Sequence, residues 1–262
     1  MEYIKLYDKA PMLIEGEKIP ELKYYPAEVR RGKGSVIIFP GGGYFRRSAH
    51  EGEGYARFLN ANGLDAFVLE YRIDPYRHPV PLMDARRAVR TVRKLAPTLG
   101  LDPDKIAVMG SSAGGHLAAH LSSTSSIERI EGEIGDDTDA ISPRPNAQIL
   151  CYPVINDHSH LGSYKHLLGE DRLDEIPTVN PLLLVDSDAP TAFVWHTETD
   201  PGVCMQDTLA YVSRLHELDV RTELHVYPTG GHGLGIAEKY PSVHRWTRDF
   251  IFFLTDLGFI EE

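Results

Sequence analysis

From residue 35 to the end of the chain, short apolar runs alternate with amphipathic stretches. The apolar runs are rich in β-branched or aromatic residues and are followed by Gly, Pro or polar residues, which is typical of buried strands. The runs are 35–40, 66–71, 106–110, 147–153, 191–196 and 222–228. Because strands that alternate with helices form a mostly parallel sheet, we predict an α/β fold of about eight strands with helices on both faces.

The stretches between these runs have the apolar spacing of helices. They are 52–63, 82–97, 113–123 and 207–218, and a further helix at 245–258 closes the chain. Apolar residues recur at helical spacing from Leu82 to Val92, so one face of that helix is expected to pack on the sheet. Its remaining positions are filled by Arg86, Arg87, Arg90 and Arg93. Residues 1–34 are less periodic, and we expect one or two antiparallel edge strands there.

The length and composition fit a single globular domain. The chain has 262 residues, of which 42% are hydrophobic and 25% are charged. This balance is ordinary for a soluble protein and leaves enough apolar mass for a sizeable core. We therefore expect residues 1–262 to form one domain.

The formal net charge of −11 excludes two classes of partner. It repels nucleic-acid backbones and anionic lipid surfaces, and no cluster of Lys and Arg offsets it locally. The N-terminal residues contain no apolar run of signal-peptide length, and no stretch reaches the roughly 18–20 apolar residues that span a membrane. We predict a cytoplasmic protein that acts on a small molecule. Its oligomeric state, a homodimer included, stays open.

The segment Gly110-Ser111-Ser112-Ala113-Gly114 lies between an expected strand and an expected helix. This is the context of the nucleophile elbow, G-x-S-x-G, in which a sharp strand-to-helix turn holds a serine in a strained conformation. The flanking positions must be tiny because larger side chains would clash in the turn. A bare G-x-S-x-G also occurs in turns without chemistry, but this context favours Ser112 as a nucleophile.

A second glycine-rich segment, Pro40-Gly41-Gly42-Gly43-Tyr44, follows the strand expected at 35–40. Acyl transfer develops an oxyanion that needs backbone N–H groups, and a glycine turn presents them without side chains in the way. We expect Gly42 and Gly43, together with the N–H of Ala113, to form this oxyanion hole. Taken alone, the segment also fits an ordinary tight turn.

A serine hydroxyl needs a base, and the base needs a carboxylate that orients it. After such an elbow, the acid and then the base follow along the chain. Asp200 follows the strand at 191–196 and His232 follows the last strand, so both lie at carboxyl ends, where an open α/β sheet builds its site. We predict Asp200 as the acid and His232 as the base. Glu198 is the rival acid, but the turn after Asp200 would present Asp200 from the loop.

Two other groups of reactive residues have simpler explanations. Asp157, His158 and His160 could hold a metal, but no H-E-x-x-H pattern or spaced cysteine set accompanies them. A polar loop at a strand end is the simpler account, so we expect no metal and no cofactor. Cys204 is a thiol without an activating motif around it, which disfavours it as a nucleophile.

Two connections, 122–146 and 156–190, are long and polar. Long loops in a compact domain are usually functional or mobile, so both are candidates for a rim or lid over a site. The second is too short for a large cap domain, and we expect at most a small lid. Tyr44 and Phe45 follow the oxyanion glycines, and we expect their rings to bind substrate by crowding the acyl side. The alternative is that both rings pack in the core.

These residues resemble the α/β-hydrolase superfamily and, within it, compact acetyl esterases and acetylxylan esterases. The resemblance covers most of the chain from Ser35 onward. It rests on the segments 40–44, 81–93, 110–121, 152–155, 195–203 and 230–235. The resemblance implies a catalytic triad of Ser112, Asp200 and His232, with the oxyanion hole at Gly42, Gly43 and Ala113.

Two positions depart from the family pattern. Related lipase-like esterases have His before the three glycines, where this chain has Pro40, and many relatives have Pro where this chain has Cys204. Neither change removes a catalytic group. The expected activity therefore stands, while the transfer of a fine substrate preference is weakened.

The sequence predicts a serine esterase that removes short acyl groups, acetyl above all, from sugars or xylo-oligosaccharides. The reaction would pass through an acyl-enzyme and need no cofactor. One alternative is an amide hydrolase of the same fold, such as an aryl-formamidase or a small peptidase, because fold does not fix substrate. Another is a catalytically inactive binding module, which would need a missing triad member.

Overall fold

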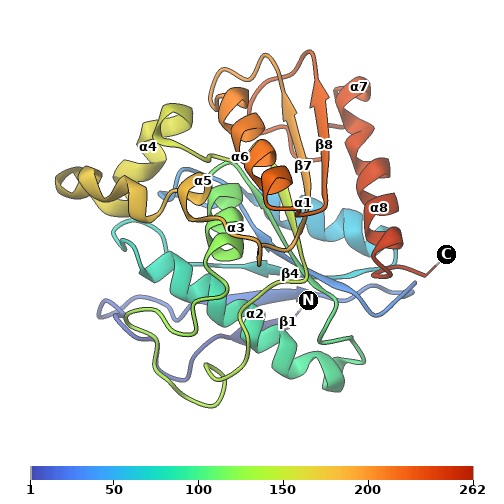
Figure 1. Ribbon diagram of the computed structural model, residues 1–262. Coiled ribbons are helices and arrows are strands. Elements are labelled where there is room, and N and C mark those ends of the chain that lie inside the picture. Colours follow the sequence, from blue (N-terminus) through green and yellow to red (C-terminus); the bar gives the residue numbers. More distant parts are fainter. Residues whose placement is uncertain (1, 262) are drawn as a thin grey trace.

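One eight-stranded sheet organises the computed structural model, which describes residues 2–261 (Figure 1). The strands are β1 (Glu2–Lys5), β2 (Glu21–Tyr25), β3 (Ser35–Phe39), β4 (Asp65–Leu69), β5 (Ile106–Ser111), β6 (Ala147–Cys151), β7 (Thr191–Thr197) and β8 (Thr222–Tyr227). Their order across the sheet is β1-β2-β4-β3-β5-β6-β7-β8. Only β2 pairs antiparallel with its neighbours β1 and β4, and all other described pairs are parallel. The predicted α/β fold class is confirmed, with its two antiparallel strands inside the first 34 residues.

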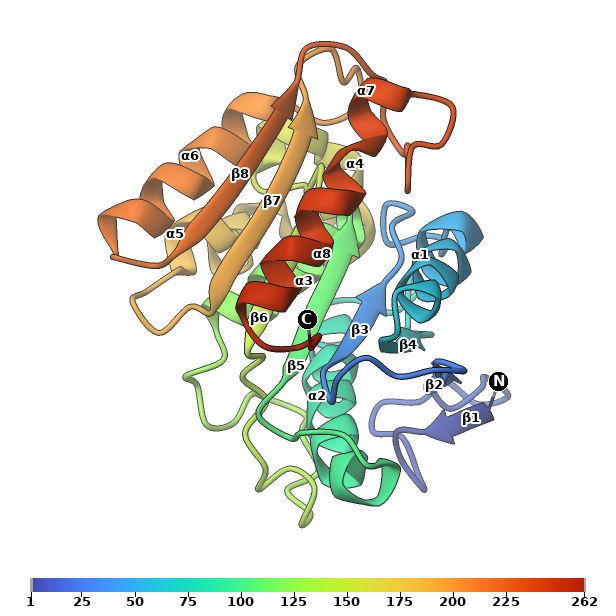
Figure 2. The same cartoon turned by 90° about the vertical axis from the view of Figure 1, so that its right-hand side faces the viewer.

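Helices cover both faces of this sheet (Figure 2). They are α1 (Ala49–Ala61), α2 (Val80–Leu99), α3 (Ala113–Ser123), α4 (Asp157–Leu168), α5 (Pro181–Leu184), α6 (Met205–Glu217), α7 (Pro241–His244) and α8 (Trp246–Asp256), with a 3₁₀ segment at Glu170–Thr178. The helices α1 and α8 lie on one face, and α2, α3 and α6 lie on the other. Of these, α4 and α5 lie in the connection 156–190, for which the sequence predicts a polar loop.

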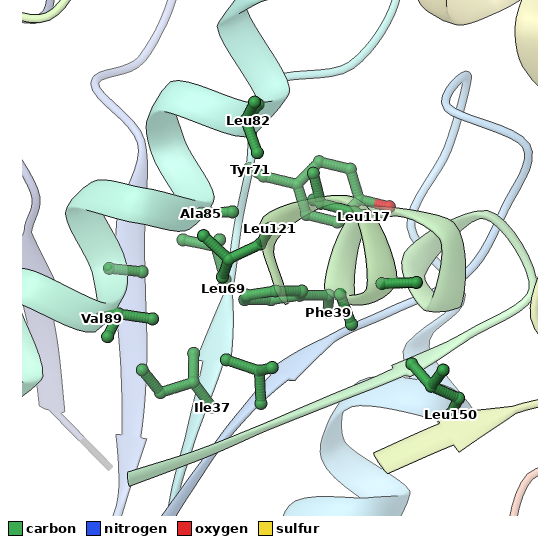
Figure 3. Close-up of a cluster of buried hydrophobic side chains, with 14 of the residues drawn as sticks. Ile37, Phe39, Leu69, Tyr71, Leu82, Ala85, Val89, Leu117, Leu121 and Leu150 are labelled. Atoms are coloured by element: carbon green, nitrogen blue, oxygen red, sulfur yellow. The ribbon is translucent and has the colours of Figure 1, made fainter. Parts of the chain in front are cut away.

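Alternation along β3 explains why both faces are apolar. All five residues of β3 are fully buried. Val36 and Ile38 pack towards α1 and α8, whereas Ile37 and Phe39 pack towards α2 and α3, because successive side chains on a strand point to opposite faces. Figure 3 shows the second of these layers, between the sheet and the helices α2 and α3. The expectation of one domain over residues 1–262 stays a prediction.

The connection 122–146 does not form a rim of the site. The helix α3 starts at the carboxyl ends of the parallel strands and runs to their amino ends, where β6 begins. The segment between α3 and β6 therefore lies at the amino edge, beside α2 (Figure 1). The expectation that it could cover the site is wrong. The other long connection, 156–190, follows the carboxyl end of β6 and stays at the site edge.

At the amino edge, the segment 122–146 covers arginines of α2 that the sequence pattern places on the side away from the sheet. Arg86 and Arg90 are 0% and 1% exposed, and both donate to Glu133 Oε1, at 2.7 and 2.5 Å. Arg87 binds Asp136 and Asp139 at 2.5 and 2.9 Å. We call these six residues the arginine cluster. The segment 122–146 thus buries the arginine-bearing side of α2, the side away from the sheet. The alternation of apolar residues and arginines along α2 gives no sign of this burial.

No helix among residues 2–261 is both long enough and apolar enough to cross a membrane.

Candidate active site

Ser112 occupies the sharp turn between β5 and α3. Its backbone has φ 53° and ψ −120°, a conformation that residues other than glycine rarely adopt. A Cβ atom on Gly110 would come within 2.1 Å of the Gly114 carbonyl oxygen, and one on Gly114 within 2.0 Å of the Phe39 carbonyl oxygen. The two glycines therefore permit the turn that places Ser112 at the carboxyl edge of the sheet.

A continuous chain of hydrogen bonds links Ser112 to His232 and Asp200. The Ser112 hydroxyl lies 2.8 Å from His232 Nε2, and His232 Nδ1 lies 2.8 Å from Asp200 Oδ2. Because an ionised carboxylate can only accept, the proton of the neutral imidazole belongs on Nδ1, which leaves the lone pair on Nε2 facing the serine. The arrangement has the geometry in which an imidazole can accept the hydroxyl proton.

Asp200 is held as a carboxylate. Burial by itself would raise the pKa of Asp200, but hydrogen bonds from His196 and His232 outweigh burial and hold this pKa well below its usual range. The backbone N–H groups of Gly202 and Val203 donate to its other oxygen at 2.7 and 3.0 Å. These donors come from the turn that follows Asp200, so the same turn presents the carboxylate and keeps it charged.

The rival acid lies elsewhere. Glu198 is exposed, whereas the Asp200 side chain is only 1% exposed and lies against His232. A carboxylate in water is strongly screened and cannot fix the orientation of a half-buried imidazole. The structure thus brings Asp200, and not Glu198, together with Ser112 and His232.

The glycine loop after β3 lies beside Ser112. Gly42 and Gly43 have positive φ angles of 128° and 64°, and a Cβ on Gly42 would come within 2.4 Å of the Arg46 carbonyl oxygen. Within residues 2–261, the N–H groups of Gly42 and Gly43 have no hydrogen-bond acceptor. Ala113 is the first residue of α3, a position whose N–H has no acceptor inside the helix. These three amides are available to an anionic oxygen.

The two expected substrate-binding aromatics lie differently. Tyr44 is 1% exposed, its hydroxyl lies 2.7 Å from His116 Nδ1, and its ring packs in the core. Tyr44 therefore serves packing, so the expectation that its ring contacts substrate from the loop is not met. Phe45 is 50% exposed and lies against His166, with ring centroids 5.1 Å apart. Only Phe45 remains a candidate for substrate contact.

The three residues that could hold a metal, Asp157, His158 and His160, do not converge on one point. His158 is exposed and lies 3.9 Å from Asp157, and His160 Nδ1 accepts a hydrogen bond from the Ser163 N–H at 3.1 Å. No group of three or more His, Cys, Asp or Glu that could hold a metal ion occurs in the described part of the chain.

Two residues near the site were missed by sequence reasoning. Glu51, in the first turn of α1, is 2% exposed, and Tyr152, just after β6, is 1% exposed. The Tyr152 ring and the His232 imidazole pack in a T-shaped arrangement, with ring centroids 5.1 Å apart. Glu51 lies just before the predicted helix 52–63, and Tyr152 lies in the predicted strand 147–153 and in the segment 152–155 that carries the family resemblance, but neither position by itself indicates a role at the site.

The chain is similar to known proteins along most of its length. The family model BD-FAE matches residues 23–215. Endo-1,4-beta-xylanase B from Butyrivibrio fibrisolvens is 35% identical over 84% of this chain, and an acetylxylan esterase from Xylanibacter ruminicola is 29% identical over 77%. The crystal structure of an acetyl ester-xyloside bifunctional hydrolase from Caldicellulosiruptor lactoaceticus is 37% identical, with a TM-score of 0.92.

The extent of these matches differs. The chain spans only 35% of the length of the xylanase and 41% of that of the acetylxylan esterase. With the acetyl ester-xyloside hydrolase, the match covers 99% of this chain and 97% of the other. The region shared with the longer proteins contains the elbow, and the solved structure shares the whole fold.

Proposed function

Because the chain belongs to the BD-FAE family of α/β hydrolases, the superfamily that its motifs resemble, we propose that it is a serine carboxylic ester hydrolase. The observation that carries this proposal is the hydrogen-bonded chain from Ser112 through His232 to Asp200, with Ser112 in a strained turn. Free backbone N–H groups beside the serine add the second requirement of acyl transfer.

The reaction would proceed in two halves. Ser112 Oγ attacks the ester carbonyl carbon while His232 Nε2 accepts the hydroxyl proton, and Asp200 stabilises the resulting imidazolium. The N–H groups of Gly42, Gly43 and Ala113 bind the oxyanion. His232 then donates its proton to the leaving alcohol, which departs and leaves an acyl group on Ser112. Water repeats the sequence, with His232 as the base, and releases the carboxylic acid.

We assign short acyl groups, acetyl above all, on sugars or xylo-oligosaccharides as the substrate. The names of two relatives, an acetylxylan esterase and an acetyl ester-xyloside hydrolase, support this class. Tyr44, which follows the oxyanion glycines, packs closely with Ser163, Tyr164 and Leu167 of α4. We propose that the acyl group lies next to this glycine loop, where a long chain would have to displace packed side chains and an acetyl methyl group would not.

A substrate panel tests this assignment. It compares p-nitrophenyl acetate, butyrate and octanoate with acetylated xylo-oligosaccharides, N-formylkynurenine and a dipeptide. We expect kcat/KM to fall from acetate to octanoate, because each methylene that is not accommodated costs roughly 1–3 kcal/mol of transition-state binding. Equal or rising efficiency up to octanoate would refute the short-acyl assignment. Preference for N-formylkynurenine or the dipeptide would instead favour an amide hydrolase.

Ser112→Ala tests the reaction type. Loss of the nucleophile should lower turnover by about 10⁴ to 10⁶, while the circular dichroism spectrum stays that of the wild type. A folded variant with wild-type turnover would exclude the serine mechanism.

A further inference from the structure

Glu51 is a buried carboxylate that the reaction as described does not use. It lies in the first turn of α1 and forms no ion pair with a described cation. Its two oxygens bind two donors from different parts of the chain. Glu51 Oε2 accepts from the N–H of Gly41 at 3.1 Å, and Glu51 Oε1 accepts from the Tyr152 hydroxyl at 2.7 Å.

The first contact holds the glycine loop. Gly41 immediately precedes the two glycines whose N–H groups are free, and a Cβ on Gly41 would come within 2.5 Å of Glu51 Oε2 and 3.2 Å of Ser112 Cβ. The carboxylate, Gly41 and Ser112 are therefore in close contact. Gly41 also accepts from the N–H of Ser48 at 2.9 Å, so the loop is tied at both polar atoms of one residue.

The second contact reaches the loop that carries His232. While Tyr152 donates to Glu51, its hydroxyl oxygen accepts from the N–H of Gly235 at 2.9 Å. Tyr152 keeps a positive φ of 37°, which is costly for a residue with a side chain. Next to Glu51, His50 Nε2 lies 2.9 Å from the Gly233 carbonyl oxygen. The first turn of α1 thus contacts, directly and through Tyr152, the segment that follows His232 in the chain, at Gly233 and Gly235.

Burying the Glu51 carboxylate without a cation partner is energetically unfavourable. Removing a charged group from water without a cation partner costs several kcal/mol unless hydrogen bonds compensate it. An apolar side chain of similar volume would avoid this cost but would leave the Gly41 N–H and the Tyr152 hydroxyl without their acceptor, so the carboxylate serves to hold these two donors. The glycine loop after β3 and the histidine loop after β8 belong to strands separated by three others in the sheet, and their relative position decides whether the oxyanion hole and the proton acceptor fit one substrate.

We propose that Glu51 is a positioning residue that, through Tyr152, locks the oxyanion loop to the loop of His232. The proposal rests on the serine hydrolase function assigned above. Glu51 touches neither the substrate nor the reacting atoms. It acts through the N–H of Gly41 on one side and the N–H of Gly235 on the other.

Three variants separate position from charge. Glu51→Ala removes both contacts, and we expect kcat on p-nitrophenyl acetate to fall about 100-fold with KM within about 3-fold, since misplaced oxyanion donors lose transition-state binding. Tyr152→Phe removes the hydroxyl that joins Glu51 Oε1 to the Gly235 N–H but leaves the contact between Glu51 and Gly41, and it should cost about 10-fold. Glu51→Gln keeps an acceptor for Gly41 and a donor for the Tyr152 oxygen, so it should recover most of the lost rate. The control Glu53→Ala, at an exposed position of α1, should leave kcat unchanged.

Two further readouts exclude a merely structural role. An alkyl boronic acid, which forms a tetrahedral adduct on an active serine, should bind Glu51→Ala more weakly by the same factor as the loss in kcat/KM. Amide hydrogen exchange should accelerate at least 10-fold in segments 40–44 and 230–236 of Glu51→Ala, and only in 230–236 of Tyr152→Phe.

The outcomes are distinguishable from failure of the function itself. If the wild type hydrolyses no ester, the proposed function fails, while hydrogen exchange still measures the lock. Wild-type kcat and unchanged exchange in a folded Glu51→Ala or Tyr152→Phe variant would overturn the positioning role. Equal losses in Glu51→Gln and Glu51→Ala would also overturn it, because they would assign the effect to charge instead of position.

Discussion

Two buried polar networks lie at opposite edges of the same sheet. At the amino edge, the arginine cluster joins α2 to the segment 122–146, and at the carboxyl edge Ser112, His232 and Asp200 form a hydrogen-bonded chain. Carboxylates in both have lowered pKa values for the same kind of reason. Burial would raise the pKa of Glu133, but Arg86 and Arg90 outweigh it, as His196 and His232 do for Asp200.

The two networks differ in whether their polar groups all find partners within the protein. In the arginine cluster, carboxylates and guanidinium groups face one another, and carbonyl oxygens of residues 124–141 accept from Arg86 and Arg90. The chain at the carboxyl edge instead ends on a hydroxyl in a strained turn, beside N–H groups with no acceptor within residues 2–261. A network in which every buried donor and acceptor has a partner within the protein stabilises the fold. A network that leaves N–H groups without an acceptor can bind a ligand there. This difference yields separate expectations for activity and stability.

The largest effect is expected on activity at the carboxyl edge. Asp200→Asn should lower kcat by about 10⁴, because an amide facing His232 disturbs its tautomer and cannot stabilise an imidazolium. The free energy of unfolding of Asp200→Asn should change far less than its kcat. Glu198→Gln is the matched control, since Glu198 is exposed two residues away. Steady-state kinetics of both purified variants measure the contrast, and the opposite ranking would transfer the role to Glu198.

At the amino edge, the expected effect is on stability. Glu133→Ala leaves the buried guanidinium groups of Arg86 and Arg90 without their shared carboxylate, and we expect a loss of about 3–5 kcal/mol in the free energy of unfolding. Urea denaturation measures this loss, with the exposed Glu131→Ala as control. At temperatures where the variant is folded, kcat should match that of the wild type. A large fall in kcat would show that the two edges are coupled.

The pH dependence of stability offers a smaller, graded test. Burial lowers the pKa of His78 to about 4 and that of His116 to about 3, with the charge of Arg172 adding to the effect on His78. The unfolded chain takes up these protons near pH 6.5. Stability from the neutral imidazoles is therefore complete above about pH 6.5 and is lost as the pH falls towards 4.

We expect the free energy of unfolding to drop by roughly 2 kcal/mol between pH 6 and pH 5 from these two groups. Glu133 and Asp200, whose pKa values are lowered, should lose their contribution only below about pH 4. Denaturation at a series of pH values measures the slope, and His78→Leu should make it shallower. A flat profile between pH 6.5 and 5 would contradict the burial of neutral histidines.

The same contrast explains what the sequence could predict. Apolar alternation marked β3 to β8, and Gly110 and Gly114 marked the elbow, because both are local patterns with a local cause. Glu51 and Glu133 gave no such signal, because each acquires its partners only through the fold, from residues up to about a hundred positions away. Tyr44 was misplaced for a related reason. Its neighbour Phe45 is exposed, while the Tyr44 hydroxyl lies 2.7 Å from His116 Nδ1 on α3.

The most direct test of the account is covalent labelling of the nucleophile. A fluorophosphonate reacts with a serine only when a base activates it and an oxyanion hole binds the phosphoryl oxygen. We predict one adduct per chain, located by peptide mass spectrometry on Ser112, with labelling strongly slowed in Asp200→Asn and unchanged in Glu133→Ala. Ester hydrolysis by a protein that takes up no label at Ser112, or takes it up at another residue, would contradict the account.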